Sequence, residues 1–330
     1  MTGILLSKGF VSTYGELLAA TARRAGLALE IVHLPDDPAV RLPAADLDRI
    51  EMTMLTRDIR FSAHYQPYGD TLLAAKNLKL AYFDSTAIEQ HPFVAPLAAR
   101  GVRLTTAAGS NGVPVAQTVI TTLLMMSRLL PQYLDAQHRK SWEPARAAAQ
   151  PPDLQGQTIV IVGMGTIGAT VARFAQVLGM HVIGVRRKPR ADGDPVNEMH
   201  TLAELPQLLP RCDWLVLACP LVPETRGLIN AQSLAAMKKT AGLINVARGA
   251  LCDEAALIAA LQQGRLRCAH LDVFATEPLP TDSPLWTMPN VIMTPHSAGA
   301  SAGNELRSVK IFLDNVERWA RKEPLLNLYS

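Results

Sequence analysis

One segment limits the possible folds of this chain more than any other. Residues 158–162, Thr-Ile-Val-Ile-Val, form a short apolar run, and three glycines with the spacing G-x-G-x-x-G follow it directly. Apolar side chains with helical spacing then continue over residues 166–178. A strand that turns through such a loop into a helix is typical of the first half of a βαβ unit. The segment therefore predicts a parallel sheet that is covered by helices.

The glycine loop also predicts a ligand. Its residues are Gly163, Met164, Gly165, Thr166, Ile167 and Gly168. The first glycine permits a tight turn, the second lets the backbone approach a pyrophosphate, and the third lets helix and strand pack closely. The phosphates would face the unpaired N–H groups at the start of the helix. We expect this loop to bind a dinucleotide; the alternative is a glycine turn that only joins strand to helix.

The end of the next strand predicts which dinucleotide is bound. Residues 184–190 read Gly-Val-Arg-Arg-Lys-Pro-Arg, with four cations and no carboxylate. Proteins that select NAD usually place an acid here to hold the ribose 2′-hydroxyl. Guanidinium groups instead match a 2′-phosphate. We expect NADP(H) to be preferred over NAD(H), with Arg186 and Arg187 as the main discriminators; the alternative is a solvated basic turn.

Strands and helices alternate along most of the chain. We predict four strands before residue 84 and six between residues 158 and 294, with helices between them. Because 330 residues exceed what one hydrophobic core usually supports, two domains are expected. The predicted fold class is α/β, with two doubly wound parallel-sheet domains. A long apolar helix over residues 115–130, ended by Pro131, is also expected.

Composition disfavours several other classes of protein. A net charge of +3 and 5% aromatic residues give little reason to expect nucleic-acid binding. The apolar stretch over 113–130 carries polar residues, so a buried helix explains it better than a membrane span. Four cysteines without metal-ligand spacing indicate reduced thiols and no metal site. The N-terminus shows no secretory pattern, so a cytoplasmic protein is expected.

Three later segments place a charged side chain just beyond an apolar strand. These side chains are Arg248, Glu277 and His296. The carboxyl ends of parallel strands are where ligands bind in an open α/β sheet. There, Arg can hold a carboxylate, His can exchange a proton with a carbonyl oxygen, and Glu can keep the imidazole charged and oriented. Each residue alone has a structural alternative. Arg248 could form an ion pair at a helix end, Glu277 could be a turn residue before proline, and His296 could be a hydrogen-bonded core histidine.

Together, these motifs resemble the D-2-hydroxyacid dehydrogenase family. The matching stretches are Gly-Met-Gly-Thr-Ile-Gly at 163–168, Asn-Val-Ala-Arg-Gly at 245–249, Leu-Asp-Val-Phe-Ala-Thr-Glu-Pro at 271–278 and Thr-Pro-His-Ser-Ala-Gly at 294–299. The resemblance implies a catalytic triad of Arg248, Glu277 and His296. It also implies a homodimer, and a Rossmann NAD(P) domain at 114–301 inserted into a flavodoxin-like substrate domain formed by 1–113 and 302–330.

The resemblance implies further ligand contacts. Besides the glycine loop, Pro220, Ala247, Asp272 and His296 would contact the cofactor, while Arg248 and the loop Ser85, Thr86, Ala87 and Ile88 would hold the substrate carboxylate. Asp272 has two alternatives, orienting Arg248 or a structural role at the strand end. In the substrate loop, Ala87 and Glu89 replace the family's usual Gly and Asp, so the pose of the carboxylate is left open.

The activity implied is reduction of a small 2-oxoacid to a D-2-hydroxyacid, similar to the NADPH-preferring glyoxylate/hydroxypyruvate reductases. Bulkier 2-ketoacids stay open as substrates. The alternative function is a cofactor-sensing, corepressor-like binding protein of the same fold. Of the other polar residues, His270 is expected to pack near the sheet, and Arg57 and Arg60 to be solvated or to reach a substrate carboxylate.

Overall fold

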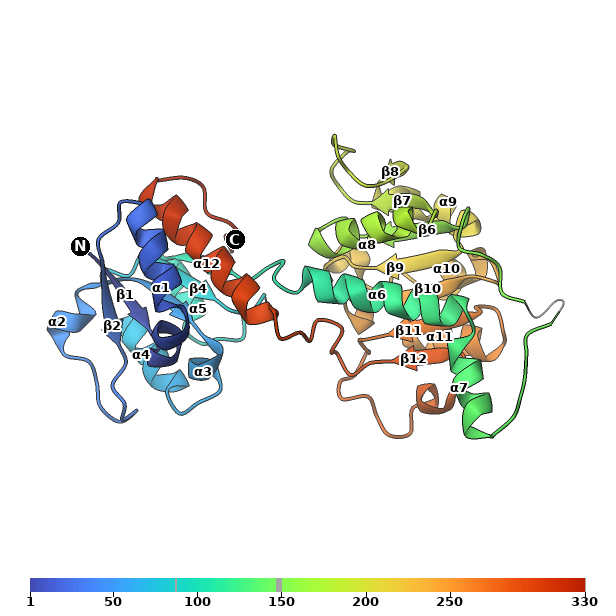
Figure 1. Ribbon diagram of the computed structural model, residues 1–330, viewed down its shortest axis with the longest axis horizontal. Helices are drawn as coiled ribbons and strands as arrows, with labels where there is room; N and C mark the ends of the chain where they lie inside the picture. Colours follow the sequence, from blue (N-terminus) through green and yellow to red (C-terminus); the bar gives the residue numbers. More distant parts are fainter. Residues whose placement is uncertain (87, 147–149, 330) are drawn as a thin grey trace. The chain divides into compact units, whose positions relative to one another are not determined.

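The computed structural model describes residues 1–86, 88–146 and 150–329. The chain divides into two compact units (Figure 1). Unit 1 comprises Met1–Ser110 and the C-terminal segment from Ala302, and unit 2 comprises Asn111–Ser301. From the sequence, domain boundaries are expected after residues 113 and 301; the two units of the structure are divided after residues 110 and 301.

Unit 1 is built on a five-stranded parallel sheet with the order β2-β1-β3-β4-β5. Its strands are β1 (Thr2–Leu6), β2 (Leu29–His33), β3 (Ile50–Leu55), β4 (Leu80–Phe83) and β5 (Arg103–Thr106). Its helices are α1 (Lys8–Arg24), α2 (Ala44–Leu47), α3 (Arg57–Arg60), α4 (Tyr65–Ala74), α5 (Val94–Ala99) and α12 (Asn304–Ala320). Four of these strands are predicted from the sequence; β5 is missed because Arg-Leu-Thr-Thr has no apolar run.

Both faces of this sheet are buried, as the alternation of side chains along β1 shows. Leu5 joins one apolar cluster, and its neighbours Ile4 and Leu6 join another on the opposite face. The second cluster contains Phe10 of α1 and Phe312 of α12, whose ring centroids lie 6.0 Å apart. The last helix of the chain therefore packs in the same unit as its first 110 residues.

Unit 2 is built on a seven-stranded parallel sheet with the order β12-β11-β10-β9-β6-β7-β8. Its strands are β6 (Thr158–Val162), β7 (His181–Val185), β8 (Glu198–His200), β9 (Trp214–Leu217), β10 (Gly242–Asn245), β11 (Cys268–Leu271) and β12 (Val291–Met293). Its α-helices are α6 (Gly112–Ser127), α7 (Leu130–His138), α8 (Thr166–Val177), α9 (Leu205–Leu208), α10 (Ala231–Ala236) and α11 (Glu254–Gln262). Short 3₁₀ turns lie at Leu202–Glu204, Leu209–Arg211, Pro223–Thr225, Gly249–Leu251 and Pro284–Thr287.

The strand order of unit 2 determines where a ligand can bind. Strand β6 lies between β7 and β9, so the chain winds outward in one direction and then in the other. The connections after β6 and β9 therefore leave the sheet on opposite faces, which opens a crevice at the carboxyl ends of these strands. The predicted α/β class with parallel sheets is confirmed. Six strands are predicted where seven occur, because β8 is only Glu-Met-His and carries no apolar signal.

The helix expected over residues 115–130 is interrupted. Helix α6 ends at Ser127, Leu129 adopts a left-handed φ of 58°, and α7 begins at Leu130. The prediction that Pro131 ends a helix is wrong: it lies in the first turn of α7, where its missing N–H needs no partner and its fixed φ suits a helix. Among the described residues no single helix is long and apolar enough to cross a membrane; α6 and α7 pass that test only as a pair, across a bend of 67°.

The four cysteines, Cys212, Cys219, Cys252 and Cys268, are free and buried, in agreement with the prediction of reduced thiols. Burial raises the pKa of the Cys212 and Cys252 thiols to about 12. Such thiols stay protonated at neutral pH and are poor nucleophiles. Within the described ranges, no group of three or more His, Cys, Asp or Glu residues is arranged to hold a metal ion.

Candidate active site

The first and third glycines of the loop after β6 are required by packing. Gly163 has a φ of 101°, a conformation that favours glycine, and a Cβ there would lie 2.5 Å from the carbonyl carbon of Ala218 and the amide nitrogen of Cys219. A Cβ on Gly168 would overlap the carbonyl oxygen of Gly163. These two glycines therefore hold β6, β9 and α8 close together.

The second glycine faces open space. No heavy atom lies within 4 Å of the position that a Cβ on Gly165 would occupy. Gly165 precedes α8, whose start has neither a side-chain cap nor an acidic residue in its first turn. The N–H groups and the positive end of the helix dipole are thus available to an anion. The loop fits the pyrophosphate of a dinucleotide, because the backbone is open at the one glycine where close approach is needed.

The end of β7 carries the two arginines expected to select the cofactor, and they differ. The Arg186 guanidinium is paired with the carboxylate of Asp194, with an Nη2–Oδ2 distance of 2.5 Å. Arg187 is exposed and makes no hydrogen bond or ion pair with another described residue. Asp194 is not predicted from the sequence, because it lies eight residues beyond Arg186 and outside any strand.

The structure brings the three predicted catalytic side chains to one edge of the sheet. His296 Nδ1 lies 2.7 Å from Glu277 Oε2, and the two side chains are 50% and 36% exposed. Partial burial acts to raise the pKa of Glu277, but hydrogen bonds from His296 and the Phe274 N–H, together with the charges of His296 and Arg248, lower it overall. The pair is accessible to a ligand, with a charged carboxylate behind the imidazole.

Arg248 is positioned by its own loop. Buried Asn245 donates from Nδ2 to the carbonyl oxygen of Arg248 at 2.9 Å and accepts the N–H of Ala247 at 3.1 Å. A Cβ on Gly249 would lie 2.5 Å from the amide nitrogen of Ala275, so this glycine lets the Arg248 loop pack against the segment that leads to Glu277. Asn245 and Gly249 belong to the motif Asn-Val-Ala-Arg-Gly, and these contacts show that they support the backbone that carries Arg248.

The turn that carries His296 is built around Asp272. His296 has a left-handed φ of 50°, and its N–H points to the carbonyl oxygens of Asp272 and Thr294 at 2.8 and 3.0 Å. Buried Asp272 accepts at Oδ1 the N–H groups of Ser297 and Ala298 and the hydroxyl of Thr294, at 2.7, 2.9 and 2.6 Å. These contacts agree with a structural role for Asp272 at the strand end. They do not indicate that Asp272 orients Arg248, because none of the three donors belongs to Arg248.

His270 lies deeper in the same sheet and is fully buried, as expected. Its Nε2 lies 3.2 Å from the Thr294 hydroxyl, and its Nδ1 has no hydrogen-bond partner. Burial lowers the pKa of His270 to about 4, against the smaller opposing charge of Asp272. A neutral, enclosed imidazole is unsuited to proton exchange with a substrate, so His270 supports the turn instead.

The other predicted cofactor contacts lie at the same edge. Pro220 follows β9 and is exposed, and Ala247 follows β10 beside Arg248. Together with the glycine loop and His296, they line the carboxyl ends of four strands, β6, β9, β10 and β12, the last of which ends three residues before His296. Their position is compatible with the predicted contacts.

The predicted substrate loop lies in unit 1, after β4. Ser85 is partly buried and Thr86 exposed, whereas the side chain of Ile88 is fully buried in the core, so only the backbone of Ile88 is left for a ligand. Ala87 lies outside the described residues. Nearby, Arg60 Nη1 lies 3.6 Å from Asp84 Oδ1, so Arg60 is paired with a carboxylate rather than simply solvated.

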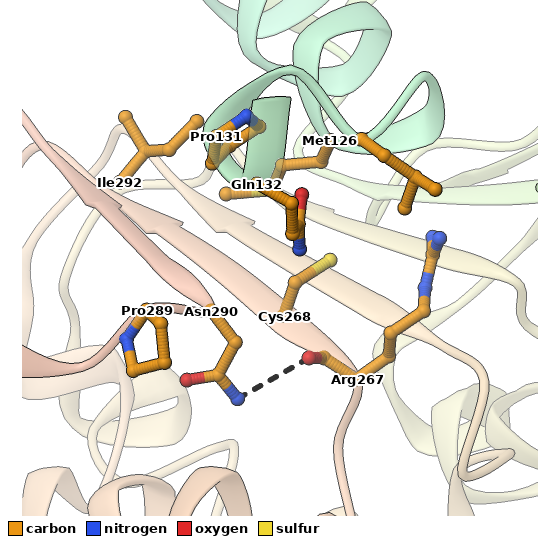
Figure 2. A pocket seen from close by; sticks show the side chains of 9 residues that line it. Met126, Pro131, Gln132, Arg267, Cys268, Pro289, Asn290 and Ile292 are labelled. Carbon is orange, nitrogen blue, oxygen red and sulfur yellow. Dashed lines mark hydrogen bonds between the residues drawn. The ribbon is translucent and has the colours of Figure 1, made fainter. Parts of the chain in front are cut away.

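A small cavity of about 40 Å³ lies elsewhere in unit 2 (Figure 2). Its lining includes Met126 and Pro131 near the bend between α6 and α7, and Cys268, the first residue of β11. Asp272 follows the other end of that strand. The cavity is therefore at the amino end of β11, away from the catalytic edge.

Comparison with known proteins agrees with this geometry. The family model described as D-isomer specific 2-hydroxyacid dehydrogenase, NAD binding domain, matches residues 120–298. The chain is 33% identical to a D-3-phosphoglycerate dehydrogenase from Methanocaldococcus jannaschii over 70% of its own length but only 44% of that protein. It is 34% identical to a glyoxylate reductase from Korarchaeum cryptofilum, covering 70% of each chain.

A solved structure is similar over nearly all of both chains. It is an NADPH-dependent glyoxylate/hydroxypyruvate reductase from Sinorhizobium meliloti in complex with NADP and sulfate, with 28% identity, a TM-score of 0.72, and coverage of 100% of this chain and 98% of that one. The chain belongs to the D-isomer specific 2-hydroxyacid dehydrogenase family, whose members named here are dehydrogenases and reductases. These relatives do not favour the corepressor-like alternative.

Proposed function

We propose that this protein is an NADP(H)-preferring reductase of a small 2-oxoacid, in the manner of a glyoxylate/hydroxypyruvate reductase. The observation that carries the proposal is the hydrogen-bonded pair of His296 and Glu277, with Arg248 close enough to lower the Glu277 pKa, at the sheet edge that also holds the open glycine loop. A carbonyl that bears a carboxylate matches one proton donor and one guanidinium at such a site.

The glycine loop would hold the pyrophosphate, and the cations after β7 would hold the 2′-phosphate. When bound, the reduced nicotinamide supplies the hydride. His296 Nδ1 is engaged by Glu277, which leaves Nε2 as the atom that gives its proton to the carbonyl oxygen. Arg248 would bind the substrate carboxylate and polarise the carbonyl. The prediction that the backbone at 85–88 also binds the carboxylate remains a prediction.

The experiment that tests this function is a panel of 2-oxoacids assayed with NADPH and NADH side by side. Glyoxylate, hydroxypyruvate, pyruvate and longer 2-oxoacids would be compared by kcat/KM. We expect turnover of the smallest members and a higher kcat/KM with NADPH. Equal or higher kcat/KM with NADH would contradict the cofactor preference. Cofactor binding without turnover of any 2-oxoacid would favour the cofactor-sensing alternative.

We also propose that two copies of the chain associate through the region of α7. This helix buries only Ala136, and it exposes Leu130, Tyr133 and Leu134 at 43%, 38% and 46%. Exposed apolar side chains on one short helix indicate a surface that a partner covers. Light scattering after size exclusion should give twice the chain mass, and Leu134→Glu should lower it to that of one chain; an unchanged mass in the variant would place the interface elsewhere.

A further inference from the structure

The loop that follows β7 is folded around one ion pair. We call residues 186–194 the basic loop. Arg186 donates from Nη1 and Nη2 to the two carboxylate oxygens of Asp194, at 2.9 and 2.5 Å. Its Nε and Nη2 also donate to the carbonyl oxygens of Lys188 and Pro189, at 3.1 and 2.7 Å. The Arg186 side chain is 21% exposed and that of Asp194 14%, so this guanidinium is largely enclosed by its own loop.

Asp194 is held in turn by the backbone. Its Oδ2 accepts the N–H of Ala191 at 2.7 Å. This hydrogen bond lowers the pKa of Asp194, and the hydrogen bond and charge of Arg186 lower it further. The carboxylate is therefore charged at neutral pH, and together with Arg186 it forms a pair with no net charge.

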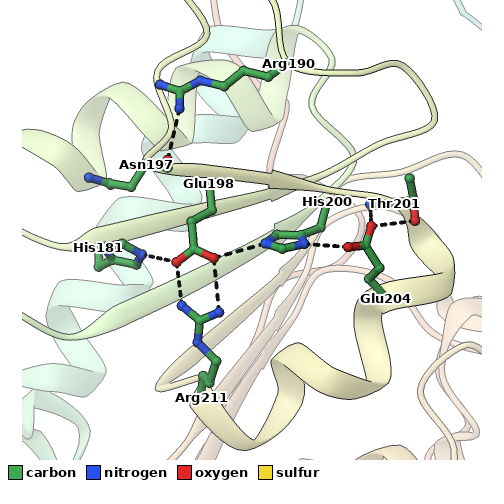
Figure 3. A network of polar contacts seen from close by, with 8 residues as sticks. All are labelled: His181, Arg190, Asn197, Glu198, His200, Thr201, Glu204 and Arg211. Atoms are coloured by element: carbon green, nitrogen blue, oxygen red, sulfur yellow. Dashed lines mark hydrogen bonds and ion pairs between the residues drawn. The ribbon is translucent and has the colours of Figure 1, made fainter.

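Both ends of the basic loop are anchored to the sheet. The N–H of Arg186 donates to the carbonyl oxygen of His200 in β8 at 3.0 Å. Beyond Asp194, Val196 is buried in the core, and Arg190 donates to the carbonyl oxygen of Asn197 at 3.1 Å (Figure 3). With the ends fixed, the Arg186–Asp194 pair determines the path of the residues between them.

Arg187 and Lys188 are the two cations of this loop whose side chains are exposed and make no hydrogen bond or ion pair with the described residues. Of the two, Arg187 has the planar guanidinium that can bind a phosphate through two hydrogen bonds. We propose that Asp194 is a positioning residue for cofactor selectivity: it locks Arg186 into the loop scaffold and leaves Arg187 as the cation that binds the 2′-phosphate. This inference rests on the proposed NADP(H) preference. A loop ordered before binding loses less conformational entropy when the phosphate arrives, so its affinity is higher.

The pairing of Arg186 with Asp194 also predicts whether a second substitution strengthens or weakens binding of the 2′-phosphate. If Arg186 is removed alone, Asp194 keeps its charge beside the phosphate site but loses its hydrogen-bonded guanidinium, with only the more distant charge of Arg190 to offset it, and repels the phosphate. Removing the Asp194 charge as well relieves that repulsion. We therefore expect Arg186→Ala with Asp194→Asn to bind a 2′-phosphate more tightly than Arg186→Ala alone. If Arg186 leaves Asp194 and binds the phosphate itself, the double variant will be no better than the single one.

The test is calorimetric and independent of turnover. The dissociation constants of 2′,5′-ADP and 5′-ADP would be measured for the wild-type protein and for four variants, Arg187→Ala, Arg186→Ala, Asp194→Asn and the double variant. Asp192→Asn is the matched control, because Asp192 is an exposed acid of the same loop without a hydrogen bond or ion pair to the described residues.

We expect Arg187→Ala to weaken 2′,5′-ADP at least ~10-fold, as loss of a charge-assisted contact does, and Asp194→Asn to weaken it ~3–10-fold through lost preorganisation. Binding of 5′-ADP should stay within about twofold throughout, and Asp192→Asn should match the wild type. The inference is overturned if Asp194→Asn weakens both ligands equally or neither, or if the double variant shows no recovery. If the wild-type protein does not prefer 2′,5′-ADP at all, the proposed cofactor preference fails first; if it does and only the Asp194 results disagree, the positioning role alone fails.

Discussion

Two regions of unit 2 carry cations just after a strand, and they use them differently. After β10, the Arg248 loop is held by the Asn245 side chain and by the close packing of Gly249, while the exposed Arg248 guanidinium donates from Nη1 to the neighbouring carbonyl oxygen of Ala247 at 2.6 Å and has no carboxylate partner among the described residues. After β7, Arg186 itself holds the loop through Asp194. Arg248 and Arg186 both follow a strand of the same sheet, yet Arg248 is exposed and Arg186 is part of the structure of its own loop. Which role applies depends on whether another group already supports the backbone.

The catalytic edge provides the largest expected effect. His296→Ala removes the imidazole that Glu277 orients, and we expect kcat for the best 2-oxoacid to fall by roughly 10²–10⁴. Steady-state kinetics at saturating NADPH would measure the loss. The control is Lys76→Ala, which removes an exposed side chain of unit 1 outside the proposed site and interface and should leave kcat unchanged. A kcat for His296→Ala within a factor of two of the wild type would remove His296 from the proposed proton transfer.

A smaller effect is expected where the backbone supports Arg248. In Gly249→Ala, the new Cβ would overlap the carbonyl group of Phe274, so the Arg248 loop must move away from the segment leading to Glu277. Because displacement of a catalytic group by about 1 Å can cost ~10²-fold, we expect kcat/KM to fall ~10–100-fold. The dissociation constant of 5′-ADP should change much less.

The matched control for that variant is Gly15→Ala in α1, where the new Cβ would lie 3.3 Å from a flexible Val11 methyl. It should keep full activity. If Gly249→Ala were as active as Gly15→Ala, the close packing of the Arg248 loop would not be needed for catalysis, and the contrast between the two cation-bearing loops would weaken.

The contrast between the Arg248 loop and the basic loop also shows which features can be predicted from the sequence. Glycine spacing after a strand and charged residues at strand ends are local patterns, and parallel strands bring their carboxyl ends to one edge, so Gly163, Arg248 and His296 can be placed from the sequence. Asp194 cannot, because its pairing with Arg186 depends on the path of an irregular loop. Burial is equally nonlocal: Ile88 fits a binding loop by position, yet its side chain is in the core.

The backbone at β8 is supported in a third way, by a network of charged side chains (Figure 3). His200 lies between two acids, with Nδ1 2.9 Å from Glu204 Oε1 and Nε2 3.0 Å from Glu198 Oε2. Arg211 and His181 bond to the same Glu198 carboxylate. Hydrogen bonds to Glu204 and Glu198 raise the pKa of His200, and hydrogen bonds from His200 and Thr201 lower that of Glu204 to about 2. The network therefore stabilises the fold within a limited pH range.

The range follows from the two directions of shift. The raised pKa of His200 means that its contribution to the free energy of unfolding is complete below its unfolded pKa, near 6.5, and is lost as the pH rises through the folded value. The depressed pKa of Glu204 means that its contribution is present above about pH 4.3 and is lost as the pH falls toward 2.

His200→Gln should therefore be less stable than the wild type at pH 6, with a smaller difference at pH 9. The effect will be the smallest of those considered, because the network is accessible to solvent and screened by salt. Denaturant unfolding at both pH values measures it, with Lys76→Gln, an exposed cation of unit 1, as the control. A His200→Gln difference that does not depend on pH would show that the side chain supports β8 by packing and not by charge.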